Sequence, residues 1–363
     1  MKIKKIILLF VFSIFLLSCK SENTEEISGS SELETKTLEE QAELIKINPL
    51  EELKGVDDLL SQLSDEPQFY SKSSNKKSTV KGIKGTIIHV DPNMLETLDG
   101  SPLGENLDIE LIEMVDMSSL MFNNTQTVSN GEIIETGGAY YLNMTSDGKQ
   151  LKIKDEKSLK VEFPIVSGKD MEVFVGDRDS LGQVNWNATE IDFKPKILPE
   201  ASYPSSTYII ANGRGATEEE LKVREKEKKR IAQEKKTYKA IDVMLFGLHN
   251  VDRFLKDPTP KTNVELIVNE NSELSGARIY AVFSDVNALA SASYYKGQSY
   301  TSRFHQFPIG KEVKILALSS IADVPYIFEK TIEISENMSV EIDFKKTTQE
   351  EIKEIAKGLR KVD

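Results

Sequence analysis

The chain has 363 residues with 59 acidic and 46 basic side chains, which gives a formal net charge of −13, and it contains one cysteine. The acidic balance argues against the basic patches that nucleic-acid binding rewards, so we expect no nucleic-acid partner. A single cysteine excludes an intramolecular disulfide and a cysteine-rich metal site. The 39% hydrophobic content is enough for a sizeable core, and the length suits two modest domains.

Residues 1–18 have the layout of a secretory signal peptide. Three lysines lie within the first five residues, and an apolar run ends at Leu17. That run is shorter than the roughly twenty residues that a permanent membrane-spanning helix needs. The stretch Leu16-Leu17-Ser18-Cys19 resembles the lipobox of bacterial lipoproteins. The resemblance implies cleavage between Ser18 and Cys19 and attachment of acyl chains such as palmitate at Cys19, and two or three such chains make a lasting membrane anchor.

Residues 19–34 are almost entirely polar, which predicts a disordered tether. Glu22, Glu25 and Glu26 lie just behind Cys19 and resemble the surface-export signal of Bacteroidota-type lipoproteins. This resemblance implies a lipid-anchored outer-membrane protein, with the cell surface favoured over the periplasmic face. A solvated tether that stays in the periplasm is the alternative.

Residues 35–65 carry apolar side chains at helical spacing on both sides of Pro49. Because proline disfavours helix in the residue before it, the pattern predicts two short amphipathic helices. We expect their apolar faces to pack on a neighbouring domain. A helix that binds a partner is the alternative.

Residues 78–197 alternate between short strand-like runs and tight-turn dipeptides. The runs are Thr86–Val90, Leu107–Ile112, Leu151–Lys154, Val161–Pro164 and Met171–Val175. Between them, Asp99-Gly100, Asn130-Gly131 and Asp147-Gly148 supply the positive backbone dihedrals of tight turns. Short strands at this spacing predict a β-sandwich domain with an Ig-like arrangement.

The turn glycines and strand residues between about 79 and 195, from Gly85 to Pro164, resemble an envelope module that recurs in Bacteroidota-type lipoproteins. More distantly they resemble the β-sandwich of ankyrins and netrin receptors. The resemblance implies that the module makes protein contacts and performs no catalysis.

Residues 216–236 form a charged segment. Thr217 and Glu220 have the spacing of a capping box, and the acidic start and basic end suit a helix dipole. We expect a solvated connecting helix, with a docking site for an acidic partner as the alternative.

Residues 237–346 return to strand patterns and predict a second β-sandwich domain. Its clearest runs are Val264–Val268, Ala277–Phe283, Val313–Leu318 and Val340–Phe344. Residues 347–363 then predict a short C-terminal helix with its apolar residues on one face.

The stretch Gly247 to Phe254 is similar to a Gly-Trp-x-Asn-x-Asp-Arg-Phe signature of uncharacterised lipoproteins of the same group. Leu248 stands where the tryptophan is usual. The resemblance implies an envelope protein of no established activity. Within this stretch a histidine near a carboxylate could act as a general base, which gives a hydrolase hypothesis for His249 and Asp252. We favour a structural role for them and for Arg253, since no nucleophile is tied to them by spacing.

No motif predicts a metal or a cofactor. Asp177 to Gly182 faintly resembles a calcium loop, but Leu181 and Ala188 occupy ligand positions, so a turn is expected. The histidines His89, His249 and His305 are dispersed. The glycine-rich segment 211–215 lacks the Lys-Ser/Thr of a phosphate loop.

Aromatic side chains give the main alternative function, a surface glycan-binding lipoprotein. Sugar rings stack on exposed aromatic faces, and the candidates are Trp186, Tyr140, Tyr141, Tyr294, Tyr295 and Tyr300. A single tryptophan more often packs in a core. The leading hypothesis is a non-catalytic envelope lipoprotein, in which a lipid on Cys19 holds the chain to the membrane and the β domains contact other envelope proteins.

Overall fold

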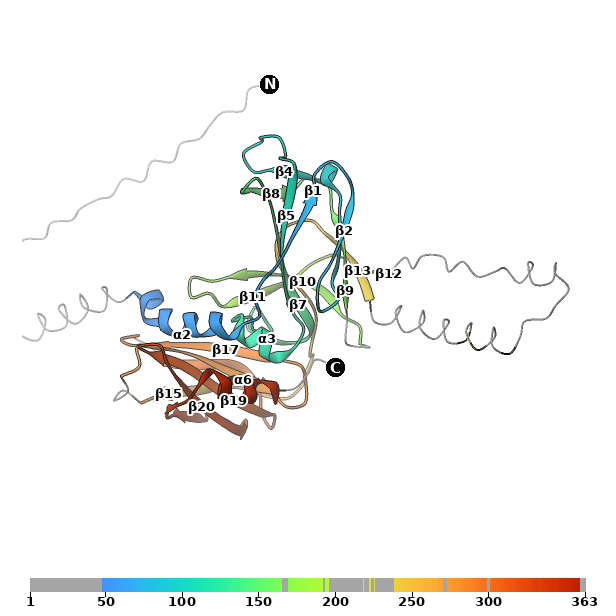
Figure 1. The fold of residues 1–363 in the computed structure, drawn as a ribbon. Coiled ribbons are helices and arrows are strands. Elements are labelled where there is room, and N and C mark those ends of the chain that lie inside the picture. The colour runs from blue at the N-terminus through green and yellow to red at the C-terminus, as the bar shows by residue number, and fades with distance from the viewer. Residues whose placement is uncertain are drawn as a thin grey trace, which may run out of the picture. The chain divides into compact units, whose positions relative to one another are not determined.

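The computed structural model describes residues 48–164, 169–191, 193–195, 238–269, 273–298 and 301–359, together with three single positions in the charged segment. Residues 48 onward belong to one unit (Figure 1). The signal peptide, Cys19, the tether, the first predicted helix, the segment 211–215 and Tyr300 lie outside the described residues. In the charged segment, the described positions Glu218, Lys222 and Glu225 are helical. Among the described residues, no helix is both long and apolar enough to cross a membrane.

The first sandwich is built from two facing sheets, here called sheets I and II. Sheet I has nine strands in the order β1-β5-β7-β14-β10-β11, with β4, β6 and β8 beside this path. Its strands are β1 (Gln68–Ser73), β4 (Leu95–Thr97), β5 (Asn106–Met114), β6 (Val128–Ser129), β7 (Glu132–Ser146), β8 (Lys149–Ile153), β10 (Glu172–Arg178), β11 (Val184–Ala188) and β14 (Gly247–Phe254).

Sheet II has five strands in the order β12-β13-β9-β3-β2. They are β2 (Ser78–Lys81), β3 (Ile87–Val90), β9 (Leu159–Pro164), β12 (Lys194–Pro195) and β13 (Tyr238–Val243). Alternate side chains of both sheets, such as Ile109 and Leu142 of sheet I and Val161 of sheet II, meet in the first-sandwich core. This alternation is the pattern that period-two burial produces.

The second sandwich pairs sheet III with sheet IV. Sheet III runs β18-β15-β21, with β15 (Lys261–Val268), β18 (Ser302–Pro308) and β21 (Ser339–Ile342). Sheet IV runs β17-β16-β19-β20-β22, with β16 (Gly276–Phe283), β17 (Leu289–Tyr295), β19 (Glu312–Ile321), β20 (Val324–Glu333) and β22 (Lys345–Lys346). Strand β16 is buried on both faces, so it has one apolar face toward each of two cores.

Within the described residues, three helices pack between the sandwiches. They are α2 (Pro49–Leu63), α3 (Met117–Phe122) and α6 (Gln349–Lys357), and a 3-10 turn, η1 (Pro92–Met94), lies in the first sandwich. Asn48 caps α2, and Thr348 forms a capping box with Glu351 at the start of α6. In Figure 1, α2 and α3 lie between the green strands of the first sandwich and the orange to red strands of the second.

The helices and both sandwiches share a third hydrophobic cluster, the junction core. Its members include Leu53, Val56, Leu59, Leu60 and Leu63 of α2, Leu120 and Met121 of α3, Phe174, Trp186 and Leu248 of sheet I, Tyr280, Leu316, Leu318 and Ile327 of sheet IV, and Ile352 and Ala356 of α6. Because one continuous apolar cluster joins these elements, the two sandwiches are expected to behave as one body.

The mainly β class is confirmed, but the strands divide differently from the predicted domains 78–197 and 237–346. Strand β1 precedes residue 78 and pairs with β5 in sheet I. Strands β13 and β14 follow residue 237, yet β13 pairs with β9 and β14 lies between β7 and β10. The physical reason is that a strand's local pattern fixes which face is buried and leaves its long-range partner open.

Candidate functional site

Hydrogen bonds donated by main-chain N–H groups join the two sandwiches beside the junction core. The Thr127 N–H donates to the Leu289 carbonyl at 2.6 Å, and the Leu289 N–H donates to the Thr127 hydroxyl at 2.8 Å. The Thr136 N–H donates to the Asn287 carbonyl at 2.8 Å. All four residues are buried, so these bonds are protected from water and fix β17 beside the first sandwich.

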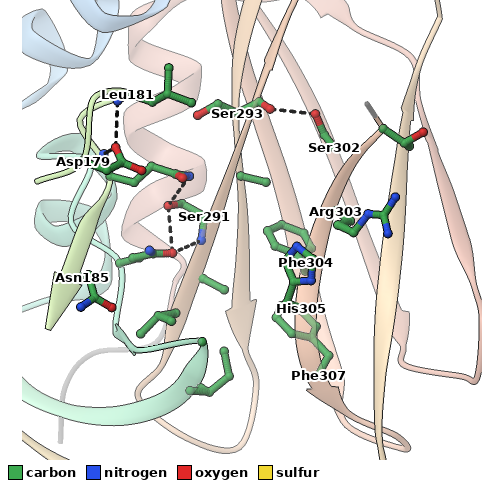
Figure 2. A pocket seen from close by; sticks show the side chains of 18 residues that line it. Asp179, Leu181, Asn185, Ser291, Ser293, Ser302, Arg303, Phe304, His305 and Phe307 are labelled. Atoms are coloured by element: carbon green, nitrogen blue, oxygen red, sulfur yellow. Dashed lines mark hydrogen bonds between the residues drawn. The ribbon is translucent and has the colours of Figure 1, made fainter. Parts of the chain in front are cut away.

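A groove with a cavity volume of about 550 Å³ opens next to this seam (Figure 2). We call it the β17–β18 groove, because the edge strands of sheets IV and III form one side of it. The hairpin between β10 and β11 and the turn at Asn130-Gly131 form the other side. The site therefore takes residues from both sandwiches, and its size suits a small ligand or a short peptide segment.

The rim of the groove is ordered by polar contacts. The Asp179 carboxylate accepts the N–H groups of Leu181 and Gln183, each at 2.9 Å. The Gln126 amide oxygen accepts the Ser291 N–H at 3.0 Å, and the Gln183 amide donates to the Ser291 hydroxyl at 3.2 Å. These bonds hold amide and hydroxyl groups in place before any ligand arrives, which lowers the entropy cost of binding.

The floor of the groove is apolar. It is formed by Ile133, Ala290, Ala292, Phe304 and Phe307, all of which belong to the core between sheets III and IV. The two alanines on β17 leave more room at this open side than larger side chains would. An apolar side chain of a ligand would therefore be desolvated there.

The signature stretch Gly247–Phe254 forms β14 in the middle of sheet I. His249 is buried, its ring stacks on Tyr140 at a centroid distance of 5.2 Å, and its Nε2–H donates to the Leu245 carbonyl at 3.0 Å. Burial lowers the pKa of His249 to about 4, so the ring is neutral at neutral pH. The His249 Nδ1 and the Tyr140 hydroxyl have no hydrogen-bond partner in the described structure.

Asp252 lies on the other face of β14. The Asn250 amide donates to its Oδ2 at 2.6 Å, and the Thr136 hydroxyl donates to the Asn250 amide oxygen at 3.1 Å. The register of β14 against β7 shifts between Asn250 and Asp252, with a bulge opposite Val251. Burial raises the pKa of Asp252 well above its usual range, although the Thr136 hydroxyl and the Gly137 N–H act in the opposite direction.

The structure does not bring His249 and Asp252 together as a catalytic pair. His249 faces the first-sandwich core with Tyr140, whereas Asp252 bonds Asn250 on the opposite face. Arg253 instead pairs with the buried Glu135 at 2.6 Å. That ion pair agrees with the structural role that we predicted for Arg253. Burial is the largest single influence on the Glu135 carboxyl and raises its pKa, but the hydrogen bonds and charges of Lys169 and Arg253 together outweigh it, so the pKa is lowered.

The three histidines lie in separate places. His89 contacts Glu162 at 2.7 Å in the first sandwich, His249 is in β14, and His305 lines the β17–β18 groove. Within the described ranges, no group of three histidine, cysteine or acidic residues is placed to hold a metal ion. The segment Asp177–Gly182 belongs to the β10–β11 hairpin, and Gly182 has a φ of +78°, so the predicted turn is confirmed.

Of the aromatic residues that suggested sugar stacking, those that the structure describes are buried or half-buried. Trp186 is fully buried in the junction core, and its indole N–H donates to the Gln126 carbonyl at 2.6 Å. Tyr140 is fully buried as well, while Tyr141, Tyr294 and Tyr295 are half-buried. Trp186 and Tyr140 were therefore wrong as candidates for a glycan platform, because their large apolar rings are buried in the cores and present no face to solvent.

A second cavity of about 440 Å³ lies between α2, α3 and the β10–β11 hairpin. The Arg278 guanidinium at its base makes two bonds of 2.8 Å to the Asp57 carboxylate, one from Nε and one from Nη2. Arg178 donates to the carbonyls of Asn123 and Asn124 at the end of α3. These arginines are used to lock elements together, so this cavity is a weaker candidate than the β17–β18 groove.

The groove residues gave no signal in the sequence. Gln183 lies in the β10–β11 hairpin, Ser291 and Ala292 are neighbours on β17, and Phe304 lies on β18. They follow no known spacing, so only the fold brings these segments together. No family model matches the chain, and no curated protein matches it.

Proposed function

We propose that the protein is a non-catalytic, lipid-anchored protein of the cell envelope that acts by contacting a partner protein. The anchor is proposed from the lipobox-like stretch Leu16-Cys19, and the outer membrane, with its outer face favoured, from the acidic residues that follow. The observation that carries the binding role is the β17–β18 groove, where both sandwiches supply fixed polar groups around an apolar floor.

A preformed groove favours binding because its walls are already rigid. The seam bonds at Thr127 and Leu289 and the junction core hold the two sides at a constant separation. Partner contacts then cost little ordering of the protein itself. An acyl anchor on Cys19 would hold this groove near the membrane.

Site-specific photo-crosslinking in intact cells tests this proposal. A photoreactive side chain replaces Gln183 on the groove rim, and the matched control replaces Lys330, which is exposed on β20. We expect a discrete protein adduct from position 183 and none from position 330. The same products at both positions, or no adduct at position 183, would contradict the proposal.

Glycan binding is the second candidate, and the amide and hydroxyl groups on the groove rim favour it. Gln126, Gln183, Asn185 and Ser291 are groups that commonly bond sugar hydroxyls. A glycan array probed with the chain distinguishes the two functions. Reproducible sugar binding that is lost in Asn185→Ala and kept in Lys330→Ala would displace the protein partner as the preferred ligand.

A further inference from the structure

We propose that the β17–β18 groove binds an extended peptide segment as an added strand beside β17, with an apolar side chain at its centre. This inference rests on the proposed function, because it names the chemistry of the partner at the same site. The argument begins with the hydrogen-bonding groups on the outer edge of β17.

The pairing of β17 with β16 leaves one edge of β17 facing the groove. Residues of β17 pair with β16 in a regular antiparallel register, with Ala292 opposite Ile279. Leu289 exchanges bonds with Thr127, so its N–H and carbonyl point away from β16. Because these directions repeat every second residue, the main-chain groups of Ser291 and Ser293 point the same way, toward the groove.

Most of these outward groups already have partners. The Ser291 N–H donates to the Gln126 amide oxygen at 3.0 Å, and the Ser293 carbonyl accepts the Ser302 hydroxyl at 2.7 Å. Figure 2 shows the contacts of Ser291 and the bond between Ser293 and Ser302 as dashed lines. The Ser291 carbonyl and the Ser293 N–H make no hydrogen bond with any described residue outside sheet IV.

The remaining carbonyl and N–H have the spacing that a neighbouring strand requires. In a β-ladder, the carbonyl of one residue and the N–H of the residue two positions on are bridged by a single stretch of extended chain. That stretch would lie opposite Ala292. The contacts at Gln126 and Ser302 occupy the flanking main-chain groups of β17. Pairing is therefore limited to three ligand residues, one opposite Ala292 and its two neighbours.

The side-chain preference follows from the faces of β17. Paired residues on adjacent strands point to the same face, so the central ligand residue would point with Ala292 toward the groove floor. There it would meet Phe304 and Ile133. Its two neighbours would point to the opposite face, where Ser291 and Gln183 are polar. The preferred sequence is therefore polar, apolar, polar.

Fluorescence polarisation with the full chain in detergent tests this proposal. The probe is a fluorescein-labelled Gly-Thr-Val-Thr-Gly peptide, and its matched control carries N-methyl groups on Val and on the following Thr. These two methyl groups remove the donor to the Ser291 carbonyl for either strand direction. We expect a loss of affinity of about 5- to 150-fold, which is the cost of about 1–3 kcal/mol for leaving a desolvated carbonyl without its hydrogen bond.

Two protein variants test the other side of the pairing. Ser293→Pro removes the N–H, whereas Ser293→Ala keeps it and loses only the hydroxyl that accepts from Arg278. We expect weak binding for the proline variant and near-normal binding for the alanine variant. If the proline variant fails to fold, the N-methyl comparison on the unchanged protein still decides the matter.

Hydrogen exchange gives a direct local readout. The peptide should slow exchange of the Ser293 amide and leave the Ser291 amide, already bonded to Gln126, nearly unchanged. Equal binding of the two peptides, or unchanged exchange at Ser293, would overturn the proposal, as would binding of diacetylchitobiose without binding of the peptide. A protein adduct from position 183 combined with either negative result would reject strand pairing and leave the proposed function standing.

Discussion

The ion pair between Arg278 and Asp57 allows a quantitative test of how α2 is held. The Arg278 side chain is 2% exposed and the Asp57 side chain 39% exposed, and two bonds of 2.8 Å join them. Asp57→Ala leaves the guanidinium buried beside Ser293 without its counter-charge. Breaking a buried pair costs about 3–5 kcal/mol, and the partial exposure of Asp57 places our expectation at the lower end, about 3 kcal/mol.

Urea unfolding followed by tryptophan fluorescence measures this loss. Trp186 is the only tryptophan and lies in the junction core, so its emission reports the part of the molecule where α2 packs. The double variant Asp57→Ala/Arg278→Met removes both charges, and we expect it to be more stable than Asp57→Ala alone. An unchanged urea midpoint for Asp57→Ala, or a double variant less stable than the single one, would refute the reasoning.

Three further predictions concern buried groups. Because the pKa of His249 is about 4 in the folded protein and 6.5 when unfolded, protonation favours unfolding, so stability should fall by up to about 3 kcal/mol as pH drops through this window. The variant His249→Phe should lack that fall in a urea titration at several pH values, and an identical pH profile would count against it. The raised pKa of Asp252 has the opposite sign, because the folded state keeps a proton that the unfolded state loses above pH 3.8. Asp252→Asn should therefore gain stability relative to the unchanged protein as pH rises from 4 to 8, and a constant difference would contradict this. Gly276→Ala would place a Cβ 2.3 Å from the Glu52 carbonyl oxygen of α2, so it should lower the thermal midpoint. The decrease should be much larger than that of the control Ser275→Ala, which removes one hydrogen bond to the same carbonyl. Equal midpoints for the two variants would contradict the packing of α2 on sheet IV.

Local features of the fold were predictable from the sequence. Alternating runs such as Leu107–Ile112 and Val264–Val268 became strands β5 and β15, since period-two burial is written in neighbouring residues. The dipeptides Asn130-Gly131 and Asp147-Gly148 have positive φ at both positions, as their turns require. The second of the two predicted amphipathic helices is α2, which begins at Pro49 because proline is favoured in the first turn of a helix.

Long-range features were not predictable. Nothing in residues 238–254 shows that β14 fills the space between β7 and β10, because strand partners are chosen by the whole sheet. Strand β7 runs through Gly137 and Gly138, whose missing side chains allow a bulge against the Val251 carbonyl but read in the sequence as a break. The groove depends on these pairings, so its residues could not be found from spacing alone.

The chemical state of Cys19 is the most direct test of the anchoring that underlies the proposed function. Mass spectrometry of the N-terminal peptide from membrane-extracted protein measures it. We predict a peptide that begins at Cys19 and carries a diacylglyceryl group on sulfur together with an acyl group on its amine. A peptide that begins elsewhere, or an unmodified Cys19, would contradict the account.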